Sequence, residues 1–182
     1  MKCPIATLVA TALLIIVCGR FVFAADLLVY LDQEFRFRVE YPASWERRGT
    51  TGTSIRLMAH SKDGDTCFFD VGAAPKSKGR EPAKLVSGVL EGDALQKLLR
   101  KSMPNAEVVS TQRTRFGNQA AAFMVFTATS EEATLRTPWK GMGVLTWRNG
   151  YSYGGTCITQ HDRYSTMEAL FKGILGTFVF TR

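Results

Sequence analysis

The most regular feature of the chain is an alternation of apolar and charged residues between Phe35 and Tyr41. Every second residue in this segment is aromatic or aliphatic, and the residues between are arginine or glutamate. A period of two places the apolar side chains on one face, so the segment predicts a strand that is buried on one side. Pro42 ends the strand, because proline cannot donate a hydrogen bond to a central ladder. Trp45 follows three residues later.

Several other segments have the alternation, or the β-branched and aromatic composition, of strands. They cover residues 27–31, 54–60, 66–73, 108–115, 120–129, 136–148, 151–160 and 176–180. Asp63-Gly64 lies between the second and third of these segments, and Asn149-Gly150 lies between the sixth and seventh. Both dipeptides tolerate the positive φ of tight turns, so they predict two antiparallel hairpins.

Two regions have the period of an amphipathic helix. Residues 81–103 carry an apolar stripe, which Gly88 and Gly92 weaken and can divide into two pieces. A closing helix has one apolar face from Tyr164 to Phe178. Asp162 or Ser165 is expected to cap it, because the segment from Ser165 to Glu168 has the spacing of a capping box.

The order of these elements is strands, a helical region, a run of strands and a closing helix, without repeats, low-complexity tracts or linkers. Segregated strands and helices are typical of the α+β class. We therefore expect one domain with a largely antiparallel sheet covered by helices.

The first 24 residues have the pattern of a secretory signal peptide. Lys2 precedes an apolar run that ends at Cys18, and Ala24 and Val22 occupy the positions that signal peptidase reads. The run is shorter than the roughly 20 residues that a membrane-spanning helix needs. We expect cleavage near Ala24 and a mature domain of residues 25–182 in the periplasm or secreted. An uncleaved leader that anchors a surface protein is the alternative.

Removal of the leader changes the composition. The net charge falls from +7 to +5, because Lys2 and Arg20 are lost, and two of the four cysteines remain. Cys67 and Cys157 lie in predicted strands of an exported protein, where oxidised pairs persist. We expect them to form a disulfide that closes a loop of about 90 residues. Two buried free thiols are the alternative.

The strand that ends in Tyr41-Pro42-Ala43-Ser44-Trp45 and the closing segment from Phe171 to Phe180 resemble the PsbP-like superfamily of α/β/α sandwiches. Within that group the chain is similar to exported bacterial proteins such as DcrB. The resemblance covers nearly the whole mature chain. It implies an α/β/α sandwich and a non-enzymatic adaptor or accessory role, and it brings no catalytic residues with it.

The sequence contains no recognised catalytic or metal-binding motif, such as a Gly-x-Ser-x-Gly elbow, a His-Glu-x-x-His pair or a Walker loop. His60 and His161 have no partner at metal-ligand spacing, so we expect both to be solvated. Asp63 and Asp65 lack the further ligands of an EF-hand and are assigned to a turn. Four glycines in strand context are expected to mark bulges or close packing: Gly141, Gly143, Gly154 and Gly155. We expect no enzyme activity, no metal and no cofactor.

Basic residues are the remaining indication of function. Seven of them form a possible surface for an anionic partner: Arg36, Arg38, Lys76, Lys78, Arg80, Arg113 and Arg115. Such a surface fits an anionic lipid, a polysaccharide or an acidic protein of the cell envelope. The alternative is that these charges only keep strand faces soluble. Nucleic acid is not expected, because the protein leaves the cytoplasm and has no reading motif.

These observations lead to one expectation of function, an exported non-catalytic binding or accessory protein of the cell envelope. An envelope hydrolase whose site is assembled from scattered residues is the alternative from another class.

Overall fold

The computed structural model describes residues 26–49, 54–129 and 138–182, which form two antiparallel sheets. The smaller sheet has the order β1-β2-β10, with β1 at Leu27–Asp32, β2 at Phe37–Pro42 and β10 at Val179–Phe180. The larger sheet has the order β3-β4-β5-β9-β8-β7-β6. Its strands are β3 (Glu46–Arg48), β4 (Ile55–His60), β5 (Thr66–Ala73), β6 (Glu107–Phe116), β7 (Gln119–Thr129), β8 (Pro138–Arg148) and β9 (Tyr151–Gln160).

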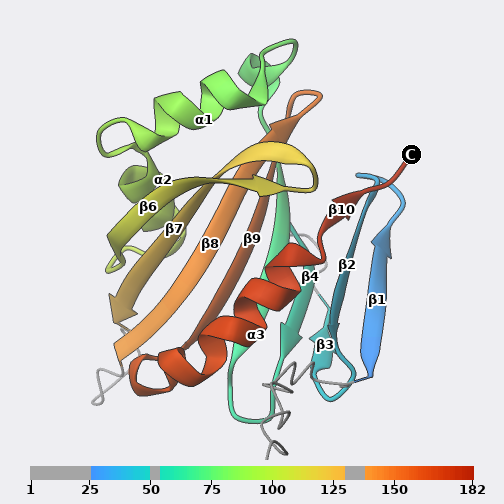
Figure 1. Ribbon diagram of the computed structural model, residues 1–182, viewed down its shortest axis with the longest axis vertical. Coiled ribbons are helices and arrows are strands. Elements are labelled where there is room, and N and C mark those ends of the chain that lie inside the picture. Colours follow the sequence, from blue (N-terminus) through green and yellow to red (C-terminus); the bar gives the residue numbers. More distant parts are fainter. Residues whose placement is uncertain (1–25, 50–53, 130–137) are drawn as a thin grey trace, which may run out of the picture.

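Helices cover both faces of the larger sheet (Figure 1). On one face α1 (Pro82–Leu90) and α2 (Ala94–Ser102) pack against β6, β7 and β8. On the other face lie α3 (Tyr164–Gly176) and the three-stranded sheet. Two short 3-10 helices, η1 (Pro75–Ser77) and η2 (His161–Arg163), come before α1 and α3. The protein is therefore of the α+β class, with an antiparallel sheet between helical layers, as the sequence predicted.

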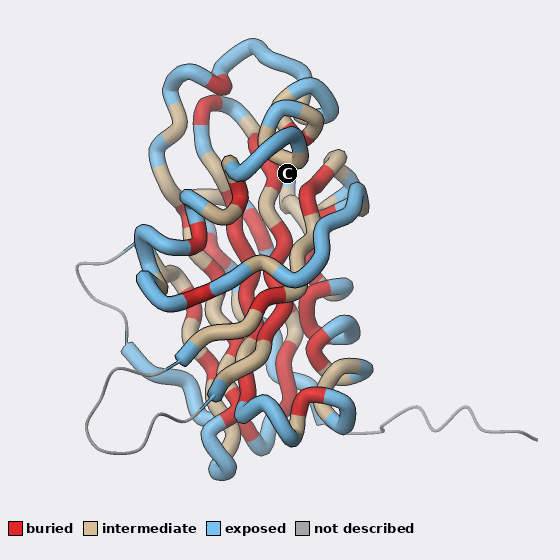
Figure 2. The backbone as a smooth tube through the Cα atoms, turned by 90° about the vertical axis from the view of Figure 1, so that its left-hand side faces the viewer, coloured by how far each residue is buried: buried red, intermediate tan, exposed pale blue. Residues whose placement is uncertain are grey.

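The main core lies between the two sheets and α3, and buried residues run along the middle of the strands (Figure 2). Its centre is a group of stacked phenylalanine rings. The ring centroid of Phe178, which follows α3, lies 4.0 Å from that of Phe116 and 5.1 Å from that of Phe37. Trp45 is buried in the same cluster, so the indole after Pro42 has the packing role that its position suggests.

Cys67 on β5 and Cys157 on β9 form a disulfide, which confirms the predicted pairing. The two residues are directly opposite in the register of neighbouring strands, and both side chains point into the main core. The bond therefore fixes the centre of the larger sheet, where residues 90 apart in the sequence meet.

Several predicted strand bounds differ from the observed ones. The predicted closing strand at 176–180 is reduced to β10, because α3 runs to Gly176. β2 begins at Phe37 instead of Phe35, because Arg36 has a φ of 54° and belongs to the β1–β2 turn. The register of β4 against β5 shifts between Ile55 and Leu57. This irregularity sends the side chain of Arg56 to Asp32, where its Nε lies 3.0 Å from the carboxylate. An alternation of residue types reports the face of a strand and not its φ, so neither feature is visible in the pattern.

The helical region divides at Gly92, which has a φ of 67°, while Gly88 stays inside α1. The predicted capping of α3 by Asp162 or Ser165 is wrong. The N-cap position is Arg163, and no side chain caps the helix. The reason is that η2 leads directly into α3, so the Tyr164 N–H donates to the backbone carbonyl of His161 instead.

No helix in the described ranges combines the length and hydropathy needed to cross a membrane. The predicted leader, residues 1–24, and the predicted cleavage near Ala24 lie outside the described residues.

Candidate functional site

Three loops meet at the end of the molecule that carries the C-terminus, which is the upper end in Figure 1. They are the β1–β2 turn at Arg36, the loop from Pro75 to Arg80 and the β8–β9 turn at Asn149-Gly150. Backbone hydrogen bonds fix their positions. The Ala74 N–H donates to the carbonyl of Gly150 at 2.7 Å and joins the second loop to the third, and the Thr181 N–H, which follows β10, donates to the carbonyl of Arg36 at 2.8 Å and ties the first loop to the C-terminal segment. Asn149 and Gly150 both have positive φ, as their hairpin sequence predicted.

Three hollows open around the β8–β9 turn and share lining residues. The first, of about 290 Å³, lies between Arg36 and Arg148 and has Tyr151 in its wall. The second, of about 420 Å³, has Arg148 on one side and Arg80 on the other. The third, of about 320 Å³, lies under η1 and has Arg80 and Lys76 in its lining. Because Arg148 lines the first two and Arg80 lines the last two, the three hollows lie next to one another in a row.

Five cationic side chains line or border this row, and we call them the basic end: Arg36, Lys76, Lys78, Arg80 and Arg148. None of the five forms an ion pair with a carboxylate in the described part of the chain. The two carboxylates in the lining are already engaged, since Glu34 pairs with Arg56 and Glu81 with Lys84. Cationic side chains therefore outnumber carboxylates along the row, and the charges of the five cations are left without a carboxylate partner among the described residues.

Arg148 has the most defined position of the five. Its guanidinium lies over the ring of Phe180. A cation–π contact orients a guanidinium and leaves its charge in place. Its planar donors match the oxygens of a phosphate or a carboxylate. Asn149 and Tyr151, which line the same hollow, add neutral hydrogen-bonding groups beside it.

The structure separates the seven basic residues that the sequence grouped together. Four of them belong to the basic end. Arg38 lies on the outer face of β2 and pairs with Glu40 at 3.2 Å. Arg113 and Arg115 are exposed on β6, where Arg113 donates to the Ser87 hydroxyl and Arg115 to the Asn118 carbonyl.

Arg148 was absent from the predicted basic surface. In the sequence it is only the last residue of a predicted strand, directly before Asn149-Gly150, and nothing there relates it to the other basic residues. The sheet register brings it to the basic end. Ala73 pairs with Tyr151 across β5 and β9, so the loop after β5 runs beside the β8–β9 turn. A cation next to a predicted hairpin turn was the one signal that the sequence offered.

The two histidines differ in exposure. His60 is not solvated as predicted: its side chain is 15% exposed, and Arg48 donates to its Nε2 at 3.2 Å. The reason is that β3, which the sequence did not predict, pairs with β4 and brings its own side chains beside His60. His161 is exposed in η2, as expected.

Asp65 is buried in the β4–β5 turn and accepts hydrogen bonds from the hydroxyls of Thr159 and Ser61. Arg163 lies 3.0 Å from the same carboxylate and 3.2 Å from that of Asp63. The acidic pair therefore braces the hairpin against η2. Within the described ranges no three His, Cys, Asp or Glu side chains lie close enough together to hold a metal ion.

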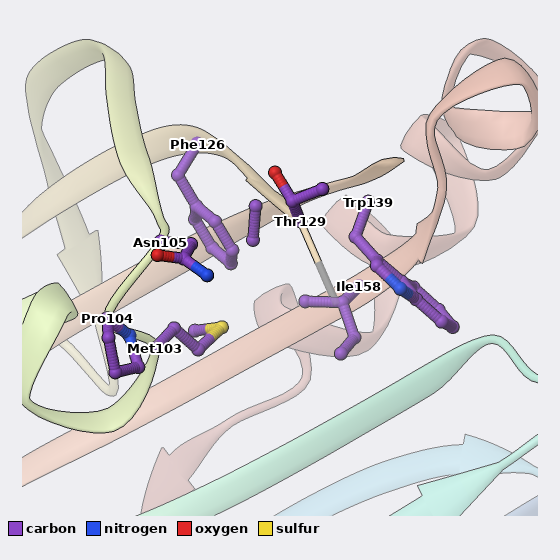
Figure 3. Close-up of a pocket in the computed structure, with 8 residues that line it drawn as sticks. Met103, Pro104, Asn105, Phe126, Thr129, Trp139 and Ile158 are labelled. Carbon is purple, nitrogen blue, oxygen red and sulfur yellow. The ribbon is translucent and has the colours of Figure 1, made fainter. Parts of the chain in front are cut away.

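A separate apolar pocket of about 330 Å³ opens on the α2 side of the larger sheet (Figure 3). Met103 forms one wall, and Phe126, Trp139 and Ile158 extend into it from three neighbouring strands. Gly141 lies between Phe126 and Ile158 in the register, where a Cβ atom would come within 2.7 Å of both side chains. The described lining contains no titratable side chain, so this pocket offers apolar contact and no charge.

Solved structures share this fold at low sequence identity. Cyanobacterial PsbP (CyanoP) from Synechocystis sp. is 16% identical, with a TM-score of 0.62 over 90% of this chain and 96% of that chain. LpqN from Mycobacterium tuberculosis, described as involved in cell envelope biogenesis, is 11% identical, with a TM-score of 0.55 over 87% and 86%. The Ran-binding protein Mog1p of Saccharomyces cerevisiae is 7% identical, with a TM-score of 0.52 over 86% and 96%.

The chain therefore has a PsbP-like fold, as the sequence resemblance implied. No family model matches the sequence, and a search of curated proteins finds no match. Because one fold hosts many unrelated functions, the role of this chain has to be argued from its own surface.

Proposed function

We propose that this protein is an exported, non-catalytic accessory protein of the cell envelope that binds an anionic partner through its basic end. The observation that carries the proposal is the row of hollows that four cations line and Lys78 borders, all five without a carboxylate partner among the described residues. Leaving cations uncompensated at one end costs self-repulsion, which a bound anion relieves.

Export is supported by three independent features. The first 24 residues have the pattern of a signal peptide. The Cys67–Cys157 disulfide is typical of proteins outside the reducing cytoplasm. LpqN, which shares the fold, is described as taking part in cell envelope biogenesis.

The group recognised is a phosphate or a carboxylate. Arg36 and Arg148 lie on the lining of one hollow of about 290 Å³, close to the size of a small-ligand site. Arginine donors match both kinds of oxyanion, and the aromatic side chains of Phe35 and Tyr151 line the same hollow. Such a group is carried by the headgroup of an anionic lipid or by the repeating unit of an acidic polysaccharide.

The test is binding of the purified protein to two probes measured side by side. One is a vesicle of phosphatidylcholine with and without phosphatidylglycerol, and the other is immobilised alginate. We expect binding to at least one anionic probe, weakening steeply as salt rises, because exposed charges are screened. Binding to the vesicles alone assigns a lipid source, and binding to alginate alone assigns a polysaccharide. Failure to bind either probe at low salt, or equal binding to neutral vesicles, would contradict the proposal.

A further inference from the structure

The open edges of the two sheets are protected in different ways, and β1 is the exception. The three residues of β3, Glu46–Arg48, are all charged, and β10 is only two residues long. β6 has an irregular register at Val109 and a polar surface beyond it. Charge, short length and bulges are the devices that keep a sheet edge from pairing with another chain.

β1 has none of these devices. Its six residues lie at the edge of the three-stranded sheet (Figure 1), and the five from Leu27 to Leu31 include no charged residue, proline or glycine. Four of its aliphatic side chains are exposed: Leu27 (50%), Leu28 (45%), Val29 (58%) and Leu31 (51%). Among the described residues no strand pairs with the outer edge of β1. An exposed aliphatic strand with such an edge can pair with another strand.

The hydrogen bonds of β1 show which residues face the free edge. The Ala43 N–H donates to the carbonyl of Asp26, so these two residues form a hydrogen-bonded pair. Leu28 and Tyr41 are the pair two residues further along the ladder. Hydrogen-bonded pairs alternate along an antiparallel ladder, so the even-numbered residues of β1 bond to β2. Leu27, Val29 and Leu31 therefore direct their N–H and C=O groups outward, away from β2.

We infer that β1 pairs antiparallel with β1 of a second copy of this chain, about a two-fold axis at Val29. In this register Val29 faces its own equivalent, and Leu27 of each copy faces Leu31 of the other. All three outward-facing residues then exchange both main-chain hydrogen bonds. A shift by two residues in either direction leaves one of the three without a partner. The contact is self-complementary, as a two-fold interface requires.

A membrane surface satisfies the hydrogen-bonding groups at the edge of β1 less well than a second strand does. Lipid tails cover aliphatic side chains, but they leave outward N–H and C=O groups without hydrogen bonds. The charges at the ends of β1 oppose the pairing only weakly. Asp26 of one copy approaches Asp32 of the other, whose carboxylate is buried and held by Arg56 and the Phe35 N–H.

The test uses protein expressed from the full reading frame and recovered after export. Its mass is followed by sedimentation equilibrium from micromolar to submillimolar concentration. We expect a mass of two chains, and Val29→Lys is expected to weaken the dimer at least about tenfold, because it places two ammonium groups face to face. Val109→Lys is the matched control, since Val109 is 59% exposed on the edge strand β6, and it is expected to leave the dimer unchanged.

Amide exchange of the unmodified protein gives a second readout that needs no variant. The amides of Leu27, Val29 and Leu31 are expected to slow as protein concentration rises, while that of Val109 stays constant. A single-chain mass throughout, or a dimer that Val29→Lys does not affect, would overturn the inference. So would a monomer whose vesicle binding depends on Val29, or one whose β1 amides are slow at every concentration, because these outcomes assign the edge to lipid or to the protein's own chain.

Discussion

The guanidinium of Arg148 lies over the ring of Phe180, 4.5 Å from its centroid. Phe180 belongs to β10, which pairs with β2 at Phe37, directly after Arg36 in the chain. The contact therefore joins the two sheets at the basic end and holds Arg148 beside the β1–β2 turn. The basic end exists only in the folded chain, because its five residues come from three segments that are distant in the sequence.

The disulfide is expected to supply a large part of the stability. Replacing both Cys67 and Cys157 by alanine should lower the free energy of unfolding by on the order of 4 kcal/mol, because the bond closes a long loop in the unfolded chain. Urea denaturation measures the change. A reducing agent should destabilise the wild type by a similar amount and leave the double variant unaffected. A wild type whose stability does not respond to reduction would contradict this account.

A side chain at Gly155 is expected to lower the stability of the fold. A Cβ atom there would lie 2.9 Å from Leu175 of α3 and 3.0 Å from the rings of Phe69 and Phe116. Gly155→Ala should therefore push α3 away from the sheet and cost roughly 1–3 kcal/mol in thermal or urea unfolding. Gly173→Ala is the control, because Gly173 is exposed in α3 with open space around it, and it should stabilise by up to about 1 kcal/mol. Effects of the same sign at the two sites would count against the packing described here.

Asp70 is expected to reduce stability at neutral pH. Burial raises the pKa of this carboxyl, which lies on β5 against Gly154 and has no cationic partner among the described residues. A raised pKa in the folded state means that its stabilising contribution is present below the ordinary pKa of aspartate and is lost as pH rises through the folded value. Asp70→Asn should therefore stabilise by on the order of 1 kcal/mol at pH 7 and have little effect in acid. A variant that is less stable than wild type at pH 7 would show that the carboxylate has a partner in solution.

Asp32 is expected to show the opposite pH dependence. Burial is the largest influence and by itself raises its pKa, but hydrogen bonds from the Phe35 N–H and Arg56 outweigh it, so the pKa is lowered. The stabilising contribution is then present above the ordinary pKa of aspartate and is lost as pH falls through the folded value. Asp32→Asn should cost on the order of 2 kcal/mol at pH 7, and unfolding curves of the two proteins should converge in acid. Parallel curves over the whole pH range would contradict the ion pair with Arg56.

The sequence predicts the larger sheet best where alternation and turn chemistry agree. The bounds of β5 and β9 match the prediction, because each strand follows a dipeptide, Asp63-Gly64 or Asn149-Gly150, that fixes where the chain reverses. β3 escaped prediction, because the charged residues Glu46–Arg48 show no alternation and pair only because β4 lies beside them. The N-terminus of α3 also differed, because the backbone of η2 does what a side-chain cap was expected to do.

The candidate site was less accessible to prediction than the fold. Arg36, Lys76, Lys78 and Arg80 were recognised as basic, but their common location depends on how β5, β9 and β2 are arranged. Arg113 was placed in the same group because charge along a sequence does not report the end of the sheet at which a residue lies. Arg148 could not be chosen at all without the register between β5 and β9.

The most direct test of the proposed function compares two charge reversals in the same binding assay. Lys62 is exposed in the β4–β5 turn, at the end of β5 that lies away from the basic end, and it has no ion pair in the described part of the chain. Lys62→Glu and Arg148→Glu change the net charge equally, because each replaces a cation by a carboxylate. With vesicles containing phosphatidylglycerol and with alginate, Arg148→Glu should weaken binding about tenfold to thirtyfold, whereas Lys62→Glu should change it less than about twofold. Equal losses for the two variants would mean that net charge alone attracts the probes, and an unchanged affinity for Arg148→Glu would mean that the basic end is not the binding site.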